Sequence, residues 1–418
     1  TVAAMAAGSA EPELRAIAKR QPACTPHHSA QLVGLGQKST PEAAAFINGT
    51  SGTFLEMDEG NRFSRGHPAV HVIPAALALS QERTVTAENF LAGMVVGYEV
   101  GSRLGAASQL RGAMHPHGTW GTLGAAAACG RVAGLDDSDM RQTINISASL
   151  TTATSKQTML EGGLVRNVYA GMSNRNGLLA LNLAECGFNG ERDGPSSLLG
   201  KIISESFQPE AVTQGLGHDW HFMRNYFKLH SCCRYNHGTL DAIDLMAAAQ
   251  RLPQVSDIER IEVVTYHLAA ELNDPAPTNT LAAKFSVPFA VATRLINHSS
   301  ALASFTWDQV RNPAVLALAQ KVTVAHDPAM SARLPMERPA KVTLHLKDGS
   351  QILGEAGVNR GDDASPYTRA ELRDKFMGLT GRVWPLAHCE KLLQATLDLA
   401  NLKTPLQGWS ELLAHPAQ

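Results

Sequence analysis

Apolar and small side chains recur at helical spacing through about residue 186, and no stretch in this part alternates convincingly like a strand. Local signals mark helix ends: Pro41 suits an early helical turn, Thr86 can cap an N-terminus, and Gly49 and Gly187 are expected to end helices. The pattern therefore predicts an all-α bundle. The predicted helices are 41–48, 74–81, 87–106, the second half of 114–130, 136–150 and 173–186.

The pattern changes near Phe222. From Ile258 to His267 apolar and polar residues alternate as in a half-buried strand, and Asp348-Gly349 is a favoured hairpin turn between two further apolar runs. This part therefore has mixed α and β character, and helical spacing returns after Tyr367. The predicted strands are 258–267, 321–325, 341–346 and 351–353, and the predicted helices are 239–251, 288–296, 371–379 and 388–402.

These elements predict a mainly α protein with two domains. A chain of 418 residues with 44% apolar residues exceeds the roughly 250 to 300 residues at which one core stops growing. We expect a large all-α helical domain from residues 1–224, a smaller α+β domain from residues 225–370, and C-terminal helices in residues 371–418 that rejoin the helical domain.

Charge and cysteine content limit the partners. The formal net charge is −2 and no long Lys/Arg run occurs, so nothing recruits nucleic acid or an anionic membrane surface. No apolar run reaches the ~18 residues of a membrane helix. The six cysteines show no paired spacing, which favours a reducing cytoplasm. Because the chain opens at Thr1 without a methionine, we expect that natural N-terminal residues precede it.

The segment from Asn48 to Pro68 is the densest acid/base cluster between apolar stretches. Charged groups are costly beside a core unless they are paired or used, so chemistry is sought here first, with a solvated turn as the alternative. Two of its carboxylates share a face whether the segment is helical or extended, which raises one pKa and leaves the other group ionised. The cluster consists of Glu56, Asp58, Glu59, Arg62, Arg65 and His67.

Three later segments offer possible partners for this cluster. His115 and His117 precede a helix of tiny residues, whose N-terminus favours an anion. Paired glycines present Arg166 and Tyr169 on a turn, although a single arginine is more often a surface residue. The third segment, a polar run from Lys228 to His237, precedes an amphipathic helix.

Several site types are excluded by spacing. No CxxC or HExxH motif supports zinc, no elbow motif supports a nucleophilic serine or cysteine, and no glycine-rich phosphate loop follows a strand. We therefore predict no metal and no cofactor. Acids, imidazoles and cations together suit proton abstraction next to a carboxylate, with the cations holding the developing enolate charge.

Taken together, these polar segments resemble those of the MmgE/PrpD family. The resemblance covers nearly the whole chain from about residue 40. It rests on the NG…(D/E)xD(D/E)…HP cluster from Asn48 to Pro68, on the HPxGTWGTxGAAAA motif that begins at His115, on the turn that ends at Gly171, and on Lys228 followed by His237 nine residues later. These motifs are specific to the family and not to one substrate.

The resemblance implies a homodimer in which the α+β domain is a smaller lid on the helical domain, with a metal-free and cofactor-free site between them. Characterised members include 2-methylcitrate dehydratase, cis-aconitate decarboxylase and iminodisuccinate epimerase. By resemblance, Glu56 stands where Asp is common, His67 and His115 match active-site histidines, and Lys228 matches a cation from the lid.

Two positions depart from the family pattern. Arg166 stands where dehydratase-like and decarboxylase-like members generally have Lys, and Phe289 falls where the decarboxylase has an active-site Tyr. Arginine grips a carboxylate with two hydrogen bonds but practically cannot give up a proton. Both departures count against decarboxylation of cis-aconitate.

The resulting hypothesis is an enzyme that removes a proton α to a carboxylate of a small di- or tricarboxylate. A 2-methylcitrate-dehydratase-like elimination is favoured over an iminodisuccinate-type epimerisation, and decarboxylation or non-catalytic carboxylate binding is less favoured. Either histidine of the motifs can be the base. The expected catalytic residues are His67, His115, Glu56, Asp58 and Lys228, and the expected substrate contacts are Arg166, Glu59, His117, Tyr169, His237 and Phe289.

Overall fold

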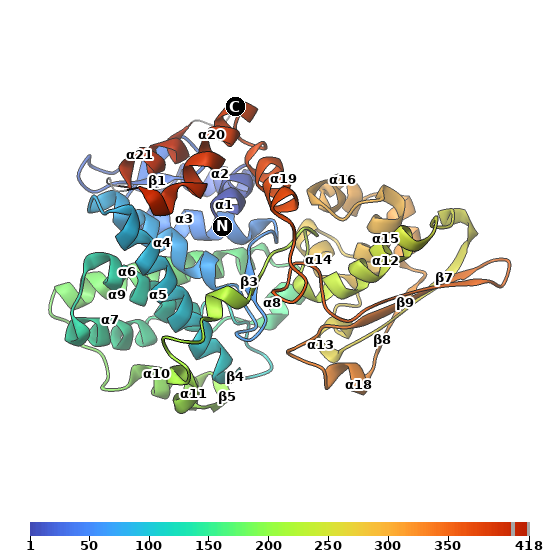
Figure 1. Cartoon of the computed structure of the whole chain (residues 1–418), viewed down its shortest axis with the longest axis horizontal. Coiled ribbons are helices and arrows are strands. Elements are labelled where there is room, and N and C mark those ends of the chain that lie inside the picture. The colour runs from blue at the N-terminus through green and yellow to red at the C-terminus, as the bar shows by residue number, and fades with distance from the viewer. Residues whose placement is uncertain (403–405, 416–418) are drawn as a thin grey trace. The chain divides into compact units, whose positions relative to one another are not determined.

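The computed structural model describes residues 1–402 and 406–415, which form two compact units. We call them the helical unit (Thr1–Lys156, Asn167–Asn225 and Thr368–Gln418) and the sheet unit (Gln157–Arg166 and Tyr226–Tyr367). Helices dominate the described residues, as predicted (Figure 1). The sheet unit takes in Gln157–Arg166, a segment that the sequence pattern placed within the helical domain. Within the described residues, no helix combines the length and apolarity needed to cross a membrane.

Helix α6 (Trp120–Ala133) lies at the centre of the helical unit. It contacts α4 (Pro68–Glu82), α5 (Ala87–Ala106), α7 (Asp137–Ser149) and α9 (Val168–Glu185). Its residues are so small that neighbouring backbones approach closely: a Cβ on Gly97 would lie 2.6 Å from the Gly124 carbonyl oxygen. The small residues of α5 and α6 thus act in helix packing, where close approach adds dispersion contacts.

Helix α3 (Pro41–Phe54) continues past Gly49, where we expected it to end. The glycine is used for packing, since a Cβ there would lie 2.7 Å from Asn174 Nδ2 and 3.0 Å from the Gly171 Cα on α9. A glycine in a helix costs about 1 kcal/mol relative to alanine, and this close α3–α9 contact offsets that cost.

Helix α4 starts at Pro68, earlier than the predicted start at Pro74, which lies inside it. Proline has no N–H to donate to the carbonyl four residues earlier, which is that of Val70. Asn174 on α9 replaces the missing donor: its Nδ2 donates to the Val70 oxygen at 2.8 Å, and its Oδ1 accepts from Ala75 N at 2.9 Å. A partner on another helix therefore keeps α4 continuous through the proline.

The remaining helices of the helical unit are twelve residues long or shorter, and its strands are shorter still. The strands span too few residues to show an alternation, which is why the sequence pattern predicted none before residue 186. The helices are α1 (Val2–Gly8), α2 (Pro12–Ala18), α10 (Gly194–Ser197), α11 (Pro209–Thr213), α19 (Arg369–Thr380), α20 (Leu386–Leu397) and α21 (Gln407–Ser410), and the strands are β1 (Ala30–Leu32), β2 (Gln37–Ser39), β3 (Gly60–Asn61), β4 (Ser108–Leu110) and β5 (Ser204–Phe207).

The sheet unit contains a four-stranded sheet in the order β10-β9-β7-β8, with β7 (Ile258–Thr265) parallel to β8 (Val322–His326) and antiparallel to β9 (Ala340–Leu346). Strands β9 and β10 (Gln351–Ala356) form the predicted hairpin, and Gly349 adopts a φ of +86° in its turn. The additional strand β6 spans Asn225–Tyr226, and the helices are α8 (Lys156–Leu160), α12 (His237–Ala249), α13 (His267–Ala270), α14 (Thr280–Lys284), α15 (Val287–Asn297), α16 (Trp307–Val310), α17 (Pro313–Ala319) and α18 (Pro328–Ser331).

Helix α12 packs on strands β9 and β10 and also contacts α15 (Figure 1). A Cβ on Gly354 of β10 would lie 2.4 Å from the carbonyl oxygen of Ala242 on α12, so the helix and the sheet meet with no side chain between them at this point. The apolar core of the unit includes Ile243, Val263 and Phe289. This packing fixes the start of α12, which carries His237.

A buried ion pair ties the segment after α11 to α5. Arg103 Nε lies 2.9 Å from Glu99 Oε2, and both side chains are almost fully buried. Glu99 Oε1 accepts from Phe222 N, while Arg103 donates to the carbonyl oxygens of Gln214 and Asp219. The pair therefore satisfies backbone groups as well as itself, which is the condition for a buried pair to persist.

We expect Arg103→Met to lower the free energy of unfolding of the helical unit by about 3–5 kcal/mol, because Glu99 would stay buried without its cation. The matched control is Arg83→Met, which breaks the more exposed pair with Glu185 and is expected to cost under about 1 kcal/mol. Urea unfolding followed by circular dichroism measures both variants. Equal costs would contradict this account.

Candidate active site

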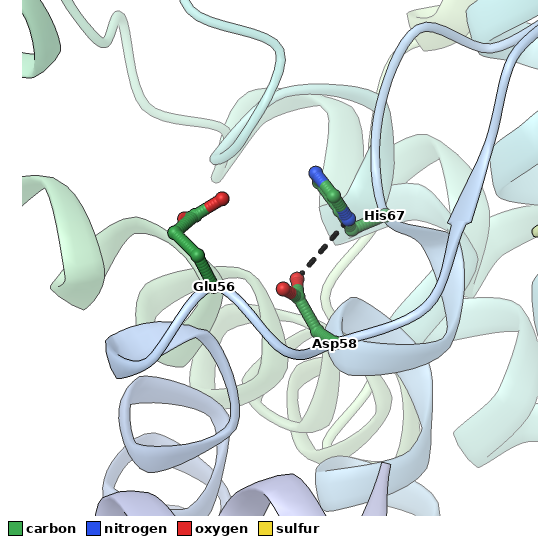
Figure 2. Close-up of side chains that lie close together, drawn as sticks. All are labelled: Glu56, Asp58 and His67. Carbon is green, nitrogen blue, oxygen red and sulfur yellow. Dashed lines mark ion pairs between the residues drawn. The ribbon is translucent and has the colours of Figure 1, made fainter. Parts of the chain in front are cut away.

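Glu56 and Asp58 follow the end of α3 in a loop that leads to α4. Glu56 has a φ of +55°, in the left-handed region, so the segment at this residue is neither helical nor extended. Such a backbone is strained for a residue other than glycine, and strain of this kind gathers at functional sites. Glu56 and Asp58 are each 1% exposed. Figure 2 shows that both carboxylates lie near the ring of His67 at the start of α4.

His67 is held from its Nδ1 side. This nitrogen lies 2.5 Å from the backbone oxygen of Glu59 and 3.2 Å from Asp58 Oδ2, the contact drawn as a dashed line in Figure 2. A carbonyl oxygen only accepts, so the Nδ1 atom carries a proton and donates it. In the neutral ring the lone pair then lies on Nε2. This assignment follows from the hydrogen-bond partners.

Glu59 lies at the same point of the loop, with its carboxylate directed at the backbone of α4. Its Oε1 accepts a short hydrogen bond from Ala69 N, and its Oε2 lies 3.5 Å from the Tyr98 hydroxyl of α5. The side chain is therefore used within the protein fold. The sequence pattern, which made Glu59 a substrate contact, could not indicate this direction.

Imidazoles of two segments form a buried cluster next to Asp58. The ring of His117 meets the rings of His67, His71 and His115 edge to face, at centroid distances of 5.1, 4.6 and 4.7 Å. Sequence reasoning missed His71, which is fully buried. Its position four residues after His67 on α4 was the available signal, because residues at this spacing share a helix face.

His115 has the opposite proton arrangement from His67. Its Nδ1 accepts a hydrogen bond from the backbone N–H of His117 at 3.0 Å, so in the neutral ring the proton lies on Nε2. Thr154 fixes this loop, since its hydroxyl contacts the carbonyl oxygens of His115 and His117 and its own carbonyl accepts from His115 N. Tyr169, at the start of α9, places its ring 5.7 Å from that of His115.

The helical unit thus brings together most of the predicted site residues, and the sheet unit holds the others. Lys228 is fully buried, and Arg166 is 2% exposed with its guanidinium 5.2 Å from the centroid of the Phe285 ring. Phe289 lies in the apolar core of the sheet unit, where its ring contacts Phe305 at 6.0 Å. Its surroundings are those of a packing residue.

His237 is also enclosed by the sheet unit. Arg234 Nη1 donates to its Nδ1 at 2.9 Å, and its Nε2 donates to the Cys232 carbonyl oxygen at 3.4 Å. Arg234 in turn binds Asp362 at 2.8 Å and the Arg360 carbonyl oxygen at 3.0 Å. Both nitrogens of His237 therefore hold the backbone that follows Lys228 in place.

Two groups of side chains among the described residues have donor atoms close enough to hold a metal ion. One is Glu56, Asp58 and His67, and the other is His230, Asp241 and Asp244 in the sheet unit. In the first group, however, His67 Nδ1 already donates to the Glu59 carbonyl oxygen. Only Nε2 of this ring then has a lone pair, which can take up a proton or bind a metal ion.

Comparison with known proteins adds the decisive observation. The chain matches the models of the MmgE/PrpD N-terminal domain over residues 1–197 and the MmgE/PrpD C-terminal domain over residues 230–399. The chain belongs to the MmgE/PrpD family. The predicted resemblance is confirmed, and it extends further toward the N-terminus than residue 40. The N-terminal match contains the imidazole cluster, while Lys228 lies between the two matches.

Relatives in the MmgE/PrpD family include two cis-aconitate decarboxylases. The enzyme of Aspergillus terreus (strain NIH 2624 / FGSC A1156) is 26% identical over 423 residues, covering 94% of this chain and 85% of its own. The enzyme of Mus musculus is 25% identical over 384 residues, covering 87% of this chain and 76% of its own. These relatives are lyases, and their reaction identifies neither the substrate nor the reaction of this chain.

The pKa of His237 is held well below its ordinary value of 6.5, first by burial and then by the neighbouring Arg234. Below pH ~6.5, His237 therefore binds a proton in the unfolded chain but not in the folded protein. The free energy of unfolding falls as the pH falls. We expect His237→Gln to reduce the slope of the unfolding free energy between about pH 6.5 and pH 5 by up to about 1.4 kcal/mol per pH unit.

Urea titrations at several pH values measure this slope. The control His218→Gln changes an exposed histidine and should keep the slope of the parent protein. An unchanged slope in the His237→Gln variant would contradict the neutral, buried state of the ring.

Proposed function

We propose that this MmgE/PrpD protein is a lyase that removes the proton α to a carboxylate of a small di- or tricarboxylate and expels a β-hydroxyl as water. The observation that supports this most is the opposite proton arrangement of His67 and His115. One neutral ring offers a lone pair at Nε2, and the other offers an N–H at Nε2. A base and an acid are the two groups that β-elimination requires.

His67 is the base in this proposal. Its Nδ1–H is fixed by the Glu59 carbonyl oxygen and faces Asp58, so Nε2 takes up the substrate proton. Asp58 then stabilises the imidazolium that forms, as a carboxylate does behind the histidine of a catalytic triad. Burial strengthens this stabilisation, because Asp58 is 1% exposed.

His115 is the acid. Because its Nδ1 is engaged by the backbone of His117, it donates from Nε2. As the C–H bond breaks, the electron pair forms the C=C bond, the C–O bond breaks, and the proton from His115 completes the departing water. Glu56 is the second carboxylate near His67, in its strained backbone conformation.

The cations of the sheet unit complete the proposal. Arg166 and Lys228 are almost fully buried, which is costly for a cation unless it is paired or used. With the sheet unit as a lid, these side chains would bind the substrate carboxylates and stabilise the enolate charge. His117 and Tyr169 would line the site, and a cytoplasmic homodimer is part of the proposal.

Decarboxylation is the second candidate, because the curated relatives are named cis-aconitate decarboxylases. Loss of CO₂ needs a proton donor but no base at the α-carbon. The base arrangement of His67 therefore supports elimination. Arg166 and the buried Phe289 also favour elimination over decarboxylation, because neither side chain supplies a proton.

We expect the protein to convert 2-methylcitrate or a related hydroxy-carboxylate with loss of water. The reaction is run in D₂O and its products are identified by NMR. His67→Gln and Asp58→Asn should lower kcat by about 10²- to 10⁴-fold, because each disables the base. His218→Gln is the control.

Release of CO₂ from cis-aconitate would favour the second candidate, and deuterium uptake with inversion would indicate an epimerase. Proton exchange that survives in both variants would refute the role of His67.

The same assay tests whether a metal takes part. Treatment with EDTA followed by gel filtration is expected to leave kcat unchanged, because the proposed base His67 and the proposed acid His115 transfer protons without a metal ion. A loss of activity that Zn²⁺, Mn²⁺ or Fe²⁺ restores would instead assign Glu56, Asp58 and His67 as ligands.

A further inference from the structure

Glu59 contacts both the proposed base and the main chain that follows it. Its backbone carbonyl oxygen accepts the Nδ1–H of His67, and its side-chain Oε1 accepts from the backbone N–H of Ala69, two residues later. Its second carboxylate oxygen lies 3.5 Å from the hydroxyl of Tyr98 on α5. Because Glu59 is 6% exposed, these contacts are shielded from water. One residue therefore holds both the ring of His67 and the main chain at Ala69, in the first turn of α4.

The start of α4 explains why this support is needed. His67 is the N-cap residue, but its side chain makes no capping hydrogen bond and points toward Asp58 instead. Pro68 has no N–H, so Ala69 supplies the first donor of the helix. A carboxylate at this position satisfies that donor and also suits the positive end of the helix dipole. Glu59 thus replaces the cap that His67 does not provide.

Glu59 is poorly suited to bind the substrate directly. The proposed substrate carries at least two carboxylates, and a third negative charge next to them would be repulsive in a buried site. Its Oε1 is used by the α4 backbone. The loop before His67 is also closed by backbone hydrogen bonds between Asn61 and Gly66. The contacts of Glu59 hold the ring of His67 and the start of α4 in place.

Resting on the proposed function, we propose that Glu59 is a positioning residue that fixes the ring of His67 for proton abstraction, rather than a substrate contact. Loss of its side-chain acceptor leaves Ala69 N–H without this partner and allows the start of α4 to move. A displacement of about 1 Å at a catalytic group costs about 10²-fold in rate. The loss falls on kcat, because substrate binding does not involve this side chain.

The test compares Glu59→Leu, which removes the acceptor, with Glu59→Gln, which keeps a carbonyl oxygen for Ala69 N–H. We expect Glu59→Leu to lower kcat by about 10- to 100-fold with KM unchanged, and Glu59→Gln to stay within about threefold of the parent. Glu88→Leu is the matched control: it removes an exposed acid from the first turn of α5, and its kcat should be that of the parent. Kinetics are measured where circular dichroism shows every variant fully folded.

Three outcomes would overturn the proposal. A rise in KM at constant kcat would make Glu59 a substrate contact. Equal losses in Glu59→Gln and Glu59→Leu would show that the charge, and not the hydrogen bond, is what matters. Unchanged kinetics in both variants would show that His67 needs no support from this side chain. Failure of the proposed function itself is distinguishable, because the parent protein would then release no water from the substrate.

Discussion

The close approach of the helix backbones around α6 is the constraint on which the candidate site depends. A Cβ on Gly121 would lie 2.5 Å from the ring of His71, and a Cβ on Gly177 of α9 would lie 2.4 Å from the Ala125 Cβ. Even the Cβ of an alanine at either glycine would therefore push α4 or α9 away from α6. The imidazoles at the N-terminal ends of α4 and α6 would then no longer meet, and the proposed base and acid would be separated.

The sequence predicted elements whose signals are local. Thr86 does cap α5, and the Asp348-Gly349 turn does join β9 to β10. Predictions failed where a distant residue overrides the local signal. Gly49 does not end α3, because the glycine allows contact with α9, and the helix start moves ahead of Pro74, because Asn174 supplies the missing donor. Local propensity does not contain such long-range compensation.

The sequence predicted which residues belong to the candidate site. It did not predict where their side chains point or which ring nitrogen of each histidine carries the proton. Composition and motif singled out Glu56, Asp58, His67 and His115, and the structure brings them together in one unit. The proton arrangements of the two histidines depend instead on single backbone groups, the Glu59 carbonyl and the His117 N–H. Every residue carries such groups, so no sequence pattern distinguishes the ones that choose a tautomer.

The replacement of a backbone hydrogen bond by Asn174 has an evolutionary consequence. The proline is tolerated because the Asn174 amide donates to the Val70 carbonyl oxygen, and the same amide also donates to the Ala170 carbonyl oxygen. Loss of Asn174 while position 74 is a proline would leave the buried Val70 carbonyl oxygen without this donor, whereas loss of the proline would leave the amide its partner at Ala170. We therefore expect homologues with a proline at position 74 to keep an amide donor at position 174.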